Sequence, residues 1–396
     1  MALASFHAMA SILLLLLSRT AGQPPLPALR IVPPVTVSGI SSGADFAVQL
    51  HVAFSDLITG SGVFAGDAYG CETHLFRGEN ASTCAAQPAN LQGAGCVCIS
   101  TLPAPAPCQG CAPGATNAQN HCKTHPGVVD IGVLAAAARS AAARGAIAPL
   151  AGLARARVYG FRGLGDPYYA DGSVQAALAL FAALGAPAAA LAFEGGVPTL
   201  HALPTVDPWL PPGTCCLPAA QQAACQWPPA MANCGFDGAG AALAHLLGAP
   251  LAPPAGPSDP ANVFAFNQTL YEAGGAWPAL ADVGYLYVPP RCAGGAAPCR
   301  LHVALHGCGM YAGAPRMNSS FYLHAGFNPH ADANDLVVLY PQGGGCALRR
   351  SSVCARAAQA QEGCWDSFGQ TGPAFAEREG PQMAAVRAMI RAVSGL

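Results

Sequence analysis

A short segment near the N-terminus, Gly39-Ile40-Ser41-Ser42-Gly43, constrains this chain more than any other feature. It is a G-x-S-x-G pentapeptide, which in a sharp strand-to-helix turn holds a serine in a strained conformation with its hydroxyl presented for reaction. Glycines are needed at both ends because side chains there would clash with the neighbouring strand and helix. The amide of Ser42, at the start of the helix, would then point toward an oxyanion forming beside Ser41.

The residues on either side of the pentapeptide show the patterns that this turn requires. Residues 29–37 are typical of a strand, and residues 44–54 carry Ala47, Leu50 and Phe54 at helical spacing. Because the chain contains 46 glycines, the pentapeptide alone would fit an ordinary Gly/Ser turn equally well. The strand before it and the helix after it favour a catalytic serine.

The rest of the chain alternates between short apolar strands and helices. We expect strands at residues 62–66, 156–161, 189–193, 301–305 and 336–340, and helices at residues 131–144, 173–184, 239–247 and 382–393. This alternation predicts an α/β fold with a mostly parallel sheet and helices on both faces.

An acid and a base for Ser41 follow it along the chain. Asp166 lies in a Gly/Pro turn just past the predicted strand at residues 156–161, and His201 comes after the next strand. A turn aspartate or one of 11 histidines would prove little by itself. The order Ser41, Asp166, His201 is nevertheless that of the α/β-hydrolases. We therefore predict Ser41 as nucleophile, His201 as general base and Asp166 as the acid that orients it.

A second small-residue loop, His306-Gly307-Cys308-Gly309, follows the predicted strand at residues 301–305. Its pattern is typical of the loop that supplies the second oxyanion-hole amide, here that of Cys308, alongside Ser42. In an ordinary α/β-hydrolase this loop precedes the nucleophile, whereas here it follows His201. We therefore expect a circularly permuted α/β-hydrolase, with a structural role for the side chain of His306.

The N-terminus and the cysteine content both indicate export. Residues 8–17 form an apolar stretch too short to cross a bilayer, and small residues follow it. We expect a signal peptide at residues 1–22, with an uncleaved anchor as the alternative, and one catalytic domain at residues 23–396. Seventeen cysteines predict disulfides formed outside the cytoplasm. Many lie in a Cys-rich insertion at residues 71–126, and the odd total leaves at least one without a partner in the chain.

Two further patterns concern metal binding and glycosylation. A zinc site is an alternative to disulfides for one group with suitable ligand spacing, formed by Cys108, Cys111, Cys122 and His125. Three N-x-S/T sequons predict glycosylation at Asn80, Asn267 and Asn318.

The charge content excludes some classes of partner. Charged residues make up 10% of the chain, the net charge is −2, and no basic block occurs. Nucleic acid and anionic membrane surfaces are therefore not expected partners, and no stable membrane insertion is expected after signal cleavage. Nothing in the sequence indicates the oligomeric state.

The chain resembles the single-domain, circularly permuted poly(3-hydroxybutyrate) depolymerases and the related esterases. The resemblance spans nearly the whole mature chain and rests on GISSGADFAVQLHVAFS at 39–55, NCGFDGAGAALAHLLG at 233–248, GYLYVPPRC at 284–292, CRLHVALHGCGM at 299–310, NPHADANDLVVLYPQ at 328–342 and GCWDSFGQTG at 363–372. It implies the same triad and oxyanion-hole residues, and it places Trp365 at the substrate cleft, with a plain core position as the alternative. It also implies a secreted serine esterase that cleaves short-chain polyhydroxyalkanoate polyester or its oligomers and needs no metal or organic cofactor.

The sequence departs from the family pattern near the predicted site. Pro167-Tyr168-Tyr169 follows the acid in place of small and β-branched residues, and Ser367-Phe368 replaces an aromatic pair. These changes leave the substrate open, so a feruloyl or acetyl esterase of cell walls is the nearer alternative. A catalytically silent secreted binding protein is the farther one, and the complete triad argues against it.

Overall fold

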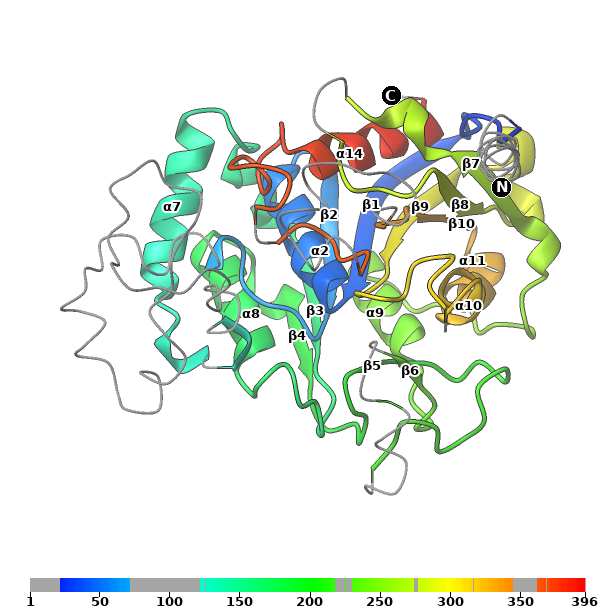
Figure 1. Cartoon of the computed structure of the whole chain (residues 1–396), viewed down its shortest axis with the longest axis horizontal. Helices are drawn as coiled ribbons and strands as arrows, with labels where there is room; N and C mark the ends of the chain where they lie inside the picture. The colour runs from blue at the N-terminus through cyan, green and yellow to red at the C-terminus, as the bar shows by residue number, and fades with distance from the viewer. Residues whose placement is uncertain are drawn as a thin grey trace, which may run out of the picture.

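The computed structural model describes residues 22–71, 122–124, 126–217, 225, 230–273, 277–315, 317–344, 362–367 and 369–395. Its central feature is an eight-stranded sheet in the order β4-β3-β2-β1-β9-β10-β8-β7 (Figure 1). The strands are β1 (Ile31–Ile40), β2 (Ile58–Phe64), β3 (Arg157–Phe161), β4 (Leu191–Glu194), β7 (Val263–Asn267), β8 (Val283–Tyr287), β9 (Cys299–Leu305) and β10 (Leu336–Tyr340). Neighbouring strands are parallel except where β8 pairs with β10 and β7.

The strand order confirms the circular permutation. Strands β7 to β10 come late in the chain, yet they form one half of the sheet, and β9 pairs directly with β1 in the register Gly39↔Leu305. The loop that normally precedes the nucleophile thus reaches its usual place from the C-terminal half. The amide of Leu29 donates to the carbonyl of Val393 at 2.8 Å, so the two ends of the described chain meet, as a permuted fold requires.

Helices cover both faces of the sheet, as predicted (Figure 1). One core cluster contains Val37 and Val303 and includes residues of α2 (Ser42–Ala53), α7 (Ile131–Ala143), α8 (Ser173–Ala183) and α14 (Pro381–Ser394). The other contains Ile40 and Ala304 and includes residues of α9 (Gly238–Leu247), α10 (Ser320–His324) and α11 (Phe327–Asn334). The strands supply both clusters because alternate side chains point to opposite faces.

A small two-stranded sheet lies outside the main one. It joins β5 (Ala202–Pro204) to β6 (Ala230–Ala232) in parallel register. Strand β5 begins directly after His201, so its pairing with β6 holds the segment that follows the predicted base. Within the described ranges, no helix is long and apolar enough to cross a membrane.

Five disulfides join cysteines of the described residues: Cys71–Cys122, Cys215–Cys225, Cys216–Cys234, Cys292–Cys299 and Cys308–Cys364. The first of them occupies Cys122 and so removes one ligand of the zinc alternative. No cluster suited to a metal ion occurs in the part of the chain that the structure describes. Cys108, Cys111, His125 and Asn80 lie outside the described residues, as do most of the predicted signal peptide and Cys-rich insertion.

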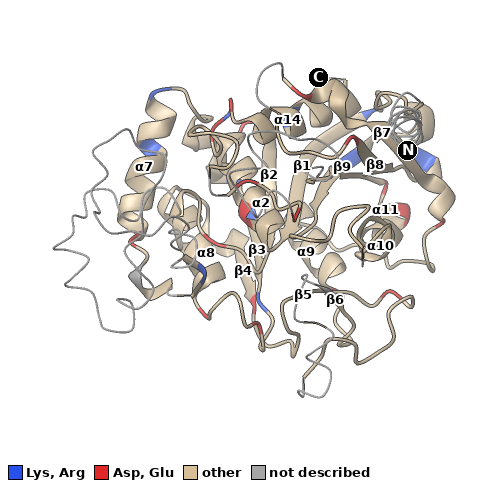
Figure 2. Cartoon of the chain, in the orientation of Figure 1, with Lys and Arg blue, Asp and Glu red and all other residues tan. Residues whose placement is uncertain are grey.

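Charged residues are few and scattered along the described chain (Figure 2). The two other sequon asparagines differ in their surroundings. Asn318 is exposed, whereas half-buried Asn267 accepts hydrogen bonds from the amide and hydroxyl of Thr269 in its own sequon, at 3.0 and 2.7 Å. Glycosylation at these positions stays a prediction.

Candidate active site

The pentapeptide forms the sharp turn that its sequence predicts. Ser41 sits between the end of β1 and the start of α2, with φ 57° and ψ −128°. This left-handed backbone is strained for a residue with a side chain, and such strain concentrates at functional sites. The turn sets Ser41 at the carboxyl edge of the parallel strands, where ligands bind in open α/β sheets.

The two glycines of the pentapeptide are required by close contacts. A Cβ on Gly39 would lie 2.1 Å from the carbonyl oxygen of Gly43, at the start of α2. A Cβ on Gly43 would lie 2.3 Å from the carbonyl oxygen of His306, just past β9. Larger residues would therefore push the helix away from the strand, or the His306 loop away from the helix.

Asp166 and His201 meet as predicted. Asp166 follows β3, His201 follows β4, and the Oδ2 of Asp166 lies 2.8 Å from the Nδ1 of His201. The other carboxylate oxygen, Oδ1, accepts the amides of Tyr168 at 2.8 Å and Tyr169 at 3.0 Å. Parallel strands β3 and β4 end side by side, so their following loops bring acid and base together.

The electrostatics of this pair favour a charged acid. Burial acts to raise the pKa of Asp166, but the charge of His201 and the hydrogen bonds from His201, Tyr169 and Tyr168 outweigh it and hold that pKa below its usual value. An ionised Asp166 accepts the Nδ1 proton of His201, which leaves Nε2 as the basic nitrogen. The buried Nε2 has no hydrogen-bond partner among the described residues, so it is available to a reacting group.

The predicted oxyanion-hole residues also lie beside the nucleophile. Ser42 is the first residue of α2, so its amide has no partner within the helix. Cys308 lies just past β9, the strand next to β1. Across the described ranges, neither the Ser42 nor the Cys308 amide donates to an acceptor.

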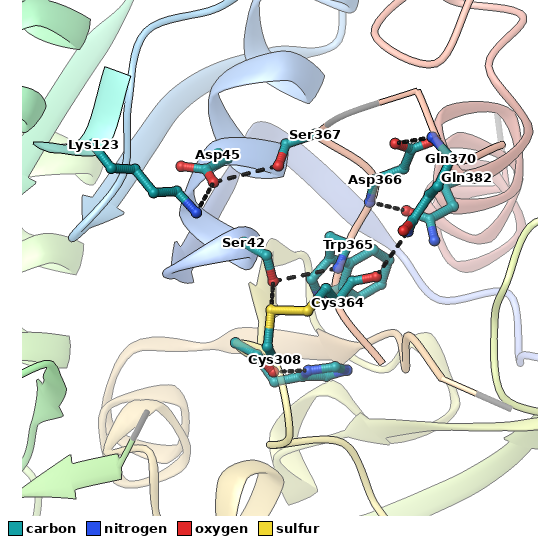
Figure 3. The surroundings of a disulfide bond; sticks show 12 residues. Ser42, Asp45, Lys123, Cys308, Cys364, Trp365, Asp366, Ser367, Gln370 and Gln382 are labelled. Atoms are coloured by element: carbon teal, nitrogen blue, oxygen red, sulfur yellow. Dashed lines mark hydrogen bonds and ion pairs between the residues drawn. A yellow bond between two sulfur atoms is a disulfide. The ribbon is translucent and has the colours of Figure 1, made fainter. Parts of the chain in front are cut away.

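A disulfide ties the segments around the predicted oxyanion-hole residues together (Figure 3). Cys308 is bonded to Cys364, and the hydroxyl of Ser42 donates to the Sγ of Cys308 at 3.3 Å while it accepts the amide of Trp365 at 3.3 Å. Three segments distant in sequence are thereby fixed around the start of α2.

His306 and Trp365 are buried beside these residues. The Nδ1 of His306 donates to the carbonyl of Gly307 at 2.8 Å and its Nε2 accepts the amide of Gly343 at 3.0 Å, while burial lowers its pKa to about 4. Trp365 is fully buried and stacks on Phe46 with ring centroids 4.9 Å apart. The place of Trp365 at the substrate cleft, with the core as the alternative, stays a prediction.

A buried polar group that sequence reasoning missed lies behind the triad. Asp45, in the first turn of α2, accepts the phenol of Tyr169 at 2.9 Å and the amide of Asp67 at 3.0 Å, and lies 3.9 Å from the Nζ of Lys123. Desolvation raises the pKa of Asp45, against the charge of Lys123 and the hydrogen bonds. The sequence signal was a carboxylate in the apolar segment ADFAVQL.

The site is nearly closed to solvent. Ser41 is 3% exposed, Asp166 is 6% exposed and His201 is fully buried. Electrostatic interactions are stronger in such a place than in water, which suits a reaction that develops charge on an oxygen atom.

Two curated proteins are similar over almost the whole chain. The chain is 31% identical to the poly(3-hydroxybutyrate) depolymerase of Delftia acidovorans over 373 residues. That match covers 93% of this chain and 61% of the relative. It is 30% identical over 377 residues to the polyhydroxybutyrate depolymerase of Talaromyces funiculosus, covering 93% of this chain and 92% of that protein. No protein-family model matches the chain.

Solved structures agree with these relatives. The PHB depolymerase from Penicillium funiculosum superposes with a TM-score of 0.69 at 28% identity, over 94% of this chain and 99% of that one. A PHB depolymerase variant in complex with an R3HB trimer gives a TM-score of 0.66 at 27% identity, with the same coverage. Sequence, strand order and structure point the same way: the chain belongs to the polyhydroxybutyrate depolymerase family of serine esterases.

Proposed function

We propose that the protein is a secreted serine esterase that hydrolyses poly(3-hydroxybutyrate) or its oligomers through an acyl-enzyme. The observation that carries this proposal is the 2.8 Å hydrogen bond between Asp166 and His201 at the sheet edge where Ser41 occupies its strained turn. A nucleophile, a base and an orienting acid on one edge are the parts of nucleophilic ester hydrolysis.

In the first half of the proposed reaction, the Oγ of Ser41 attacks the ester carbonyl. The Nε2 of His201 takes the hydroxyl proton, and Asp166 stabilises the imidazolium that forms. The amides of Ser42 and Cys308 stabilise the tetrahedral oxyanion, and each such donor contributes on the order of 3–4 kcal/mol in comparable enzymes. Collapse of the intermediate transfers the proton from His201 to the departing alcohol oxygen and leaves an ester on Ser41.

The second half repeats these steps with water. His201 removes a proton from the water as it attacks the acyl-enzyme, and the same two amides hold the new oxyanion. Breakdown of that intermediate returns the proton to Ser41 and releases a hydroxy acid or a shortened oligomer. Every proton transfer is assigned to His201, so the proposed cycle uses no cofactor.

The substrate class rests on the relatives and on the character of the site. Two curated relatives carry poly(3-hydroxybutyrate) or polyhydroxybutyrate in their names, and a structural neighbour holds an R3HB trimer. A neutral aliphatic ester suits a buried site because it carries no charge that must be desolvated.

Secretion and processing belong to the same proposal. Residues 1–22 would act as a signal peptide and residues 23–396 as one catalytic domain, with Asn80, Asn267 and Asn318 available for glycosylation. The five disulfides support maturation in an oxidising compartment.

A panel of esters tests the proposal. Wild type and Ser41→Ala would be incubated with poly(3-hydroxybutyrate), hydroxybutyrate oligomers, feruloyl esters and acetyl esters, and the released acids would be measured. We expect release from the first two substrates by wild type alone. Turnover confined to feruloyl or acetyl esters would replace the proposal with a cell-wall esterase, and no turnover of any ester would favour a silent binding protein.

A further inference from the structure

We propose that Tyr169, held by the buried carboxylate of Asp45, is a positioning residue for His201. This inference rests on the proposed function, because it assigns Tyr169 a part in the chemistry of the same triad. It concerns two residues, Asp45 and Tyr169, that lie far apart in sequence and come together only in the fold.

Tyr169 touches both the acid and the base. Its amide donates to the Oδ1 of Asp166 at 3.0 Å, and its ring lies nearly parallel to the imidazole of His201, with centroids 5.4 Å apart and an interplanar angle of 10°. Asp166 holds His201 at one ring nitrogen, Tyr169 stacks against the ring with an offset, and the neighbouring Tyr168 contacts it edge-on with centroids 5.1 Å apart. Together they limit the rotation of the imidazole and so fix the direction of Nε2.

The far end of Tyr169 is anchored to the nucleophile helix. Its hydroxyl donates to the Oδ2 of Asp45 at 2.9 Å, and Asp45 lies in the first turn of α2, directly after the elbow. Asp45 also contacts the Nζ of Lys123 at 3.9 Å and the hydroxyl of Ser367 at 3.5 Å (Figure 3). The ring that fixes the base is thereby tied to the helix that carries the nucleophile.

The polar contacts are an unusual choice for packing alone. Tyr169 is 1% exposed and Asp45 is 2% exposed, so both lose their hydration in the folded state. Apolar residues of similar volume would fill this space without that desolvation cost. A satisfied buried network does, however, hold its members in one arrangement, which is what positioning requires.

The ring of Tyr169 also lies near the place where positive charge forms in the proposed reaction. When His201 takes a proton from Ser41 it becomes a cation, and the face of an aromatic ring attracts a cation within about 6 Å of its centroid. The imidazolium exists only as the reaction proceeds, so the benefit falls on the transition state rather than on substrate binding. Loss of Tyr169 should therefore lower kcat and leave KM almost unchanged.

Variants at Tyr169 test this, with a soluble hydroxybutyrate oligomer as substrate. Tyr169→Leu should lower kcat about 30- to 100-fold with KM changed less than about 3-fold, because a loosened base loses alignment. Tyr169→Phe keeps the ring and should recover activity to within about 10-fold of wild type. Combining Tyr169→Phe with Asp45→Asn should cost less than the sum of the two single effects, because both variants weaken the same Tyr169–Asp45 bond.

Tyr287 provides a matched control. It is also fully buried and its hydroxyl also donates to a carboxylate, that of Asp332, at 2.7 Å, but it lies on β8. Tyr287→Leu and Tyr287→Phe should lower the melting temperature while leaving kcat within about 2-fold of wild type. Equal losses of kcat at Tyr169 and Tyr287, or a full kcat in Tyr169→Leu, would overturn the inference.

The outcomes separate this inference from the proposed function. A wild type that hydrolyses no ester would overturn both. An active wild type whose Tyr169 variants keep full kcat would overturn the positioning role alone. If Tyr169→Leu does not fold, the cycle of Tyr169→Phe and Asp45→Asn decides, and simple additivity of their losses would contradict the proposed link.

Discussion

The two halves of the candidate site are held in place by different physical means. The acid–base half, Asp166, His201, Tyr169 and Asp45, is held by buried charges and hydrogen bonds. The oxyanion half, Ser42, Cys308, Cys364 and Trp365, is held by a disulfide and by contacts between neutral groups.

This difference follows from what each half must do. The acid–base half changes its charge during the proposed cycle, so its surroundings must stabilise a particular protonation state as well as a position. In the proposed cycle the oxyanion half only presents two amides at fixed points, so a covalent tie is sufficient. Perturbing charge should therefore affect the first half most, and perturbing the covalent tie should affect the second.

The largest effect is expected from the acid–base half. Asp166→Asn keeps the shape of the side chain but removes the charge that selects the tautomer of His201, so kcat should fall about 10⁴-fold. Asp171→Asn is a suitable control, because Asp171 is exposed and, among the described residues, its carboxylate accepts the side-chain amide of Gln175 alone. Ester hydrolysis under saturating substrate measures both. A loss below about 10-fold in Asp166→Asn would mean that its charge is not needed.

Breaking the covalent tie should have the next largest effect on activity. Replacing Cys308 and Cys364 together by serine should lower kcat about 10- to 100-fold, because the Cys308 amide is no longer held in place. Chain-entropy arguments give a loss of about 4 kcal/mol for a 56-residue separation.

The Cys292–Cys299 bond is the matched control for that experiment. It spans only 7 residues and lies at the start of β9, away from the carboxyl edge of the sheet. Its double serine variant should lose about 2.5 kcal/mol of stability and retain wild-type kcat. Equal kcat in the two double variants would show that the Cys308–Cys364 bond has no special part in the site.

Acid should weaken the fold through buried histidines, including His306 of the oxyanion half. Burial lowers the pKa of His51 and His302 to about 3 and that of His306 to about 4. In the unfolded chain these histidines take up protons near pH 6.5, whereas in the folded protein they stay neutral to a lower pH. As the pH falls from 6 to about 4, each histidine should therefore lower the free energy of unfolding by about 1.4 kcal/mol per pH unit.

The acid–base half should respond at lower pH. The pKa of Asp166 lies below its usual value in the folded protein, so its contribution to stability is present above about pH 3.9 and is lost as the pH falls through the folded value.

Urea unfolding at pH 7, 6 and 5 would measure the histidine effect, and His51→Gln should reduce the slope of unfolding free energy against pH by about a third. A free energy of unfolding that is constant from pH 7 to pH 5 would contradict this prediction.

The smallest effect is expected from the hydroxyl of Ser42, which contacts both Cys308 and Trp365. Ser42→Ala removes the bonds to Cys308 and Trp365 but keeps the backbone amide, so it should cost about 1 kcal/mol of stability and reduce kcat only a few-fold. Thermal unfolding and ester hydrolysis measure the two quantities. A loss of kcat above about 100-fold would assign the hydroxyl itself a part in the reaction.

The same comparison shows which features can be predicted from sequence. The elbow at Ser41 was predictable because its requirements are local: two glycines, a strand before and a helix after. Asp166, His201 and Cys308 were predictable because each follows a strand, and parallel strands bring their carboxyl ends to one edge.

Other features depend on contacts that leave no local pattern. The Tyr169–Asp45 bond joins residues 124 positions apart, and the burial of Trp365 depends on Phe46 stacking against it from α2. Strands β7 and β8 were not predicted: β7 is a five-residue, half-buried edge strand, and its apolar run VFAF is too short to distinguish a strand from a buried helix segment. The three-residue strands β5 and β6 are too short to show a period.

The most direct measurement is covalent labelling of the nucleophile. A fluorophosphonate reacts with an activated serine, and peptide mass spectrometry identifies the residue that carries the label. We predict one label per chain, on Ser41, and no labelling of Ser41→Ala. An unlabelled wild type, or equal labelling of wild type and Ser41→Ala, would contradict the assignment of Ser41 as the nucleophile of this site.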